Sequence, residues 1–141
     1  MTPIQALQQA LAGEHAAIYV YGVLGGRVSS TSEPVLADAL RAAYATHRAR
    51  RDQLLTIIRD RGEEPVAAEP SYEVPTPART AEQCRVAARQ IEDRCAESYA
   101  VAVGNTARAD RQWAIDALED AAVRGLGFGA GPDAFPGVPE L

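Results

Sequence analysis

The segment 63–79 is the feature that most limits what this chain can fold into. It contains Pro65, Pro70, Pro75 and Pro77 and has no helical or strand periodicity. Seventeen extended residues can reach about 50 Å, whereas a helix of about 26 residues is about 39 Å long. The segment can therefore run the full length of a helical bundle. It predicts two helical hairpins joined by a long crossover rather than by a tight turn.

Hydrophobic periodicity predicts four helices, two on each side of this crossover. Their expected ranges are 3–28, 33–61, 80–103 and 106–126. Ser32 is the expected N-cap of the second helix, and Thr80 with Gln83 forms a capping box at the start of the third. The fold class is therefore all-α, a four-helix bundle over residues 1–128 followed by a Gly/Pro-rich tail over 129–141. In the fourth helix the expected core positions are Ile115, Leu118, Ala122 and Leu126.

Each predicted helix brings a polar, ionisable side chain toward the middle of the bundle. Glu14 occupies a core position in the first helix, and His47 lies at the centre of the apolar face of the second. Buried charges of this kind must be paired or bound to a ligand. The remaining candidates near the same level are Tyr44, Arg51, Glu92 and Glu119.

This arrangement resembles the ferritin-like superfamily, in which two Glu residues and two Glu-x-x-His motifs from four helices hold two metal ions. Three segments, beginning at Glu14, His47 and Pro70, also resemble a bacterial ferritin-like family of unassigned function. Two ligand positions depart from the metal pattern. Tyr44 stands where the second helix should carry Glu, and Ala122 stands where the fourth should carry His.

Two interpretations of the site follow. In the first, Glu14, Tyr44, His47, Arg51 and Glu92 form a buried polar network without metal, with Arg51 neutralising Glu14. The protein is then a non-catalytic structural or interaction module with no cofactor and no catalytic residues. In the alternative, Glu14, His47, Glu92 and Glu119 bind iron or manganese, and an oxidoreductase activity becomes conceivable.

Charge and cysteine content set further expectations. The net charge is −5 and all 14 basic residues are arginine, which argues against binding to nucleic acid or to an anionic membrane. Cys84 and Cys95 lie about 16 Å apart along one predicted helix, too far for a disulfide, so a reducing, cytoplasmic location is expected.

The tail carries Phe135, Val138 and Leu141 at intervals of three among prolines. A polyproline-like form would place these side chains on one face. We therefore expect the tail to pack on a bundle, its own or that of a symmetry partner. A second apolar strip on the first helix, including Tyr19, Val20 and Val23, adds to the expectation of a homodimer. No small-molecule ligand can be named from the sequence.

Overall fold

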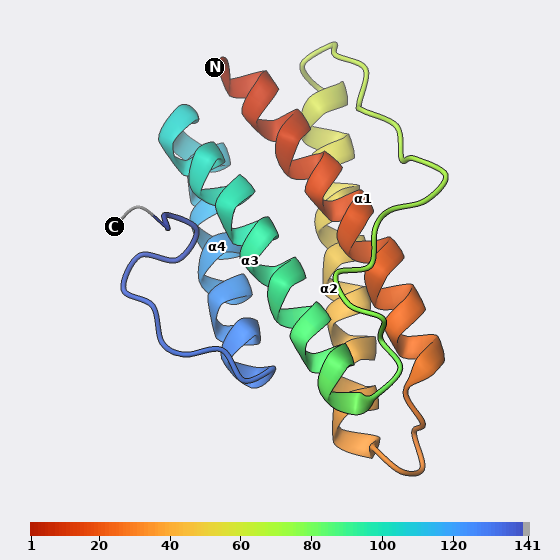
Figure 1. Cartoon of the computed structure of the whole chain (residues 1–141). Helices are drawn as coiled ribbons and strands as arrows, with labels where there is room; N and C mark the ends of the chain where they lie inside the picture. Colours follow the sequence, from red (N-terminus) through yellow and green to blue (C-terminus); the bar gives the residue numbers. More distant parts are fainter. Residues whose placement is uncertain (140–141) are drawn as a thin grey trace.

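The computed structural model describes residues 1–139, and the described chain contains four helices and no strand. They are α1 (Pro3–Arg27), α2 (Pro34–Arg59), α3 (Ala81–Asn105) and α4 (Arg108–Gly127). The chain runs along α1, returns along α2, crosses over, and then repeats the hairpin with α3 and α4 (Figure 1). α1 packs against α2 and α3, and α3 packs against α4. The prediction of an all-helical chain is confirmed.

Local signals explain where most of the helices begin and end. α1 starts with a capping box between Thr2 and Gln5, with Pro3 in the first turn, and α3 starts with the expected capping box between Thr80 and Gln83. α2 is followed by Gly62 at a φ of +75°, a conformation that favours glycine after a helix.

The prediction for the N-cap of α2 is wrong. The N-cap residue is Glu33, and no side chain caps the helix there. The hydroxyl of Ser29 instead accepts hydrogen bonds from the backbone N–H groups of Thr31 and Ser32. The serine-rich loop therefore satisfies its own backbone rather than that of the helix.

The crossover lies alongside α1 over most of the length of that helix (Figure 1). The side chain of Gln8 donates to the carbonyl of Glu64 at 2.7 Å, and Arg27, at the other end of α1, donates to the carbonyl of Pro77 at 2.6 Å. Between them the rings of Tyr19 and Tyr72 pack with centroids 5.8 Å apart.

The second apolar strip expected on α1 is therefore not free. Tyr19 is covered by the crossover, and Val20 is fully buried in the core. The sequence-based reason for placing a partner chain on α1 is wrong, because a segment of the same chain already occupies that side.

The buried face of α4 is shifted by one position along the helix from the predicted face. The buried positions are Ala114, Ala117, Ala121 and Gly125, whereas Leu126 is 45% exposed. Small side chains let two helix backbones approach closely, and α4 packs chiefly against α3. A shift of one residue rotates a helical face by 100°, so Glu119 faces solvent.

The described part of the tail contacts α3. A Cβ on Gly129 would lie 2.8 Å from Arg89 Nη1, and the backbone at Gly137 lies so close to Ala96 that a Cβ there would be 2.3 Å from its carbonyl oxygen. The polyproline prediction is wrong, because Val138 donates to the carbonyl of Phe135 across a turn with Gly137 at a φ of +78°. Phe135 is 54% exposed, and Leu141 lies outside the described residues.

Candidate functional site

Three ionisable side chains from three helices meet in the middle of the molecule. Glu14 of α1, His47 of α2 and Glu92 of α3 are each no more than 1% exposed. His47 Nδ1 lies 2.6 Å from Glu14 Oε2, and His47 Nε2 lies 3.1 Å from Glu92 Oε1. The imidazole ring thus connects two carboxylates on different helices. The structure brings together three of the six residues that the sequence placed near one level of the bundle.

His47 is protonated in this environment. Burial lowers the pKa of the imidazole, but the hydrogen bonds to Glu14 and Glu92 outweigh it and raise the pKa to about 9. Both ring nitrogens then carry a proton and donate, one to each carboxylate. The ring is a cation held between two acceptors.

Two buried tyrosines donate further hydrogen bonds to these carboxylates, while the second oxygen of Glu92, Oε2, has no hydrogen-bond partner among the described residues. The Tyr21 hydroxyl donates to Glu92, and the Tyr99 hydroxyl donates to Glu14. Burial raises the pKa of both phenols, and the neighbouring carboxylates raise it further, so both remain protonated donors. The Tyr21 ring also stacks on His47, with centroids 5.3 Å apart.

Two arginines lie at the side of the cluster that faces α4. Arg50 of α2 donates to the Tyr99 hydroxyl at 3.3 Å and pairs with Asp120. Arg124 of α4 lies 2.8 Å from Asp120 Oδ2 and 3.7 Å from Glu92 Oε2. Three basic and three acidic side chains thus balance in formal charge, and buried charges are tolerated when they are paired. They are His47, Arg50, Arg124, Glu14, Glu92 and Asp120.

Three predicted site residues lie outside this cluster. Arg51 is partly exposed and pairs with the adjacent Asp52 at 2.7 Å, so it does not neutralise Glu14. Tyr44 lies against α1, where a Cβ on Gly22 would be 3.8 Å from its ring, and does not reach the carboxylates. Glu119 is exposed for the reason given above for α4.

The sequence carried a signal for Arg50 that the prediction did not use. The buried positions of α2 include Leu40, Ala43, His47, Arg50 and Leu54, which alternate in steps of three and four. This alternation is typical of a helix facing a bundle core. The prediction used the average direction of the apolar face, which favours the position one turn after His47, namely Arg51.

The donor set does not fit a metal ion. In the described part of the chain, no three His, Cys, Asp or Glu side chains converge on a point where they could hold one. A histidine ligand needs a free nitrogen lone pair, and both nitrogens of His47 face carboxylates as hydrogen-bond partners. Cys95 lies nearby, but burial raises the pKa of its thiol well above the ordinary value.

Comparison with known proteins places this arrangement in a family. A family model described as a domain of unknown function, DUF4439, matches residues 6–140. The chain belongs to the DUF4439 family. The match covers every residue of the charged cluster, from Glu14 to Arg124.

A solved structure resembles this DUF4439 chain over most of its length. The crystal structure of a conserved hypothetical protein from Mycobacterium tuberculosis is 29% identical, with a TM-score of 0.82 and 94% of each chain covered. A search of curated proteins gives no match. Among the described residues of the DUF4439 chain, no helix is long and apolar enough to cross a membrane.

Proposed function

We propose that this protein is a ferritin-like helical bundle in which a network of charged side chains takes the place of a di-metal site. It acts as a non-catalytic structural or interaction module. The observation that carries the proposal is the position of His47, with one ring nitrogen on Glu14 and the other on Glu92. Carboxylates that would share a metal ion in a ferritin-like protein here share an imidazolium.

The network has a clear physical role in such a module. It joins α1, α2 and α3 through His47, and α2 and α4 through Arg50 and Asp120. Hydrogen-bonded charges in a core favour the one helix register in which all of them are paired. We propose that this register fixes the surface that the module presents to its partners.

The alternative, an iron- or manganese-binding protein with possible oxidoreductase activity, is tested by elemental analysis. The protein is purified without a chelator and without an affinity tag, and its iron, manganese and zinc contents are measured against protein concentration. We expect metal far below one ion per chain. Near-stoichiometric metal that is lost in a His47→Gln variant would overturn the proposal.

We also propose that the module forms a homodimer through the outer side of α4. Val123 is 66% and Leu126 45% exposed there, and Ile115 is only partly buried. Such apolar surface is costly when it faces water. Light scattering should give the mass of two chains, and Leu126→Arg should give the mass of one. A single-chain mass for the parent protein would contradict the dimer.

A cytoplasmic location completes the proposal. Cys84 and Cys95 are both buried as free thiols, an arrangement typical of proteins in reducing compartments. Fractionation of the source cells should recover the protein in the cytoplasmic fraction, and recovery elsewhere would contradict it.

A further inference from the structure

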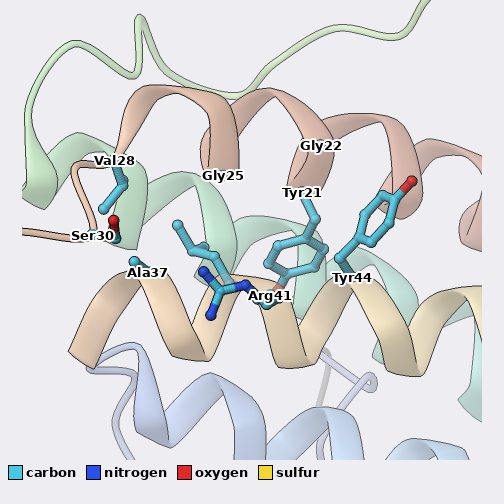
Figure 2. Close-up of a pocket in the computed structure, with 9 residues that line it drawn as sticks. Tyr21, Gly22, Gly25, Val28, Ser30, Ala37, Arg41 and Tyr44 are labelled. Carbon is cyan, nitrogen blue, oxygen red and sulfur yellow. The ribbon is translucent and has the colours of Figure 1, made fainter. Parts of the chain in front are cut away.

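A cavity of about 320 Å³ opens between α1 and α2 near the loop that joins them, beside Tyr21, which contacts the charged cluster. Figure 2 shows Tyr21 extending from α1 toward α2 and Tyr44 extending from α2 toward α1, with Arg41 and Ser30 toward the end near the α1–α2 loop. The size lies at the lower end of the range for small-molecule sites. Aromatic rings and a few polar groups also line such sites.

The charge of the lining favours an anion. Arg41 is its charged residue, and no carboxylate lines the cavity, although the chain as a whole carries −5. Arg41 pairs with Asp38 at 2.7 Å, and both side chains are at least 70% exposed. An exposed pair of this kind is weak, so the guanidinium is available to an incoming carboxylate, which it can bind through two hydrogen bonds.

Two helical glycines form the α1 side of the cavity. A Cβ on Gly25 would meet no atom within 4 Å, and one on Gly22 would meet only the Tyr44 ring, at the ordinary contact distance of 3.8 Å. Glycine is less favourable than alanine inside a helix. Because packing within the protein does not require these glycines, their effect is to leave the α1 side of the cavity flat and open.

We propose that this cavity binds a small planar aromatic carboxylate, with its ring against Tyr44 and the glycine side of α1 and its carboxylate on Arg41. Tyr44 is partly exposed, so its ring can pack against the aromatic ring of a ligand. The single guanidinium fixes the orientation of the ligand, with its negatively charged end at Arg41.

Such a ligand would be linked to the charged cluster. Tyr21 lines the cavity, its hydroxyl donates to Glu92, and its ring stacks on His47. A ligand that fills the cavity therefore lies beside Tyr21, the residue on which His47 stacks. His15, the other histidine of the chain, lies on α1 and contacts the crossover at Val66 instead.

The probe is 2-naphthoate, measured by calorimetry and by NMR of the histidine ring protons. We expect saturable binding with a dissociation constant on the order of 0.1–1 mM, typical of a ligand of this size. The His47 signals should shift on binding while the His15 signals stay in place. The neutral 2-naphthamide should bind about tenfold more weakly, because it lacks the charge that Arg41 recognises.

Matched variants locate the site. Gly25→Leu fills the cavity and should abolish binding, whereas Gly26→Leu, the adjacent helical glycine with no neighbour within 4 Å and outside the lining, should leave it unchanged. Arg41→Gln should weaken binding about tenfold, and Arg59→Gln, an exposed change near the other end of α2, should not. Thermal melting of each variant shows that it is folded.

The proposal stands only if both cavity variants lose affinity and both controls keep it. Absence of saturable binding would overturn it. Equal binding by the parent protein and Gly25→Leu would show that the ligand binds outside the cavity. Equal binding by the parent protein and Arg41→Gln would show that Arg41 does not recognise the negative charge of the ligand. Neither result would bear on the metal content that tests the proposed function.

Discussion

Arg50 and Arg51 are adjacent, but Arg50 belongs to the charged cluster whereas Arg51 pairs only with Asp52. Replacing each of them by leucine tests this difference. The Arg50 side chain is 9% exposed and that of Arg51 is 26% exposed. Arg50→Leu removes a charge-assisted pair with Asp120, worth about 1.5–3 kcal/mol. It also removes a cation–π contact with Tyr99 at 5.3 Å, worth about 0.5–2 kcal/mol.

Other contacts limit this loss. Asp120 keeps Arg124 at 2.8 Å and is 43% exposed, so Arg50→Leu strands no carboxylate, and the buried leucine returns about 1 kcal/mol. We expect Arg50→Leu to lower the free energy of unfolding by about 2–3 kcal/mol, below the 3–5 kcal/mol typical when a buried charge is left unpaired. Arg51→Leu breaks only a surface pair with Asp52 and should cost less than about 1 kcal/mol.

Urea unfolding followed by circular dichroism at 222 nm measures both variants, with equal m-values as the check that only stability has changed. A double-mutant cycle with Asp120→Asn should show coupling to Arg50 and none to Arg51. Equal losses for the two leucine variants would refute the placement of Arg50, and a larger loss for Arg51→Leu would restore the prediction made from the sequence.

Three further predictions concern other parts of the molecule. Because the pKa of His47 rises from 6.5 in the unfolded chain to about 9 in the folded protein, its contribution to stability is complete below pH 6.5 and is lost as the pH rises to 9. The contribution amounts to about 3 kcal/mol, and unfolding curves that keep the same difference between parent and His47→Gln from pH 6 to 10 would contradict it. Gly137→Ala should release the tail from α3, because its Cβ would lie 2.3 Å from the Ala96 carbonyl oxygen; proteolysis within 129–139 should then become faster, and an unchanged rate would refute the contact. Cys84 and Cys95 are buried, and burial raises the pKa of both thiols. A thiol reagent should therefore react with the native protein far more slowly than with the urea-unfolded chain. Equal reaction rates would show that the core is open.

Much of the fold could be predicted because it depends on local signals and on length. The crossover 63–79 was identified from its prolines and its reach, and the capping box at Thr80 from four residues. Glu14 and His47 were placed in the core by helical periodicity alone. These features need no knowledge of which helix packs against which.

The errors arise where the answer depends on the neighbouring helix. In α4 the larger residues Ile115 and Leu118 suggested one face, but close packing against α3 selects the alanine face that includes Ala117 and Ala121. Rotation of that face also moved Glu119 to the surface. Periodicity within one helix cannot reveal how closely its neighbour approaches.

The roles of the tyrosines could not be predicted for a related reason. Helical spacing places Tyr21 and Tyr99 on the apolar faces of their helices, and both are buried. Whether a buried hydroxyl reaches a carboxylate on another helix depends on the relative height of the two helices. That height is set by the complete set of contacts, which includes Glu14 and Glu92 themselves.

The central claim is that His47 is an imidazolium held between two carboxylates, in the place where a ferritin-like protein would hold metal. Nitrogen-15 NMR of the two histidine rings at pH 7, before and after addition of one equivalent of Mn²⁺, tests it directly. We expect both ring nitrogens of His47 to be protonated and their signals to be unaffected by Mn²⁺. An unprotonated His47 nitrogen whose signal Mn²⁺ broadens would contradict the account and establish a metal site.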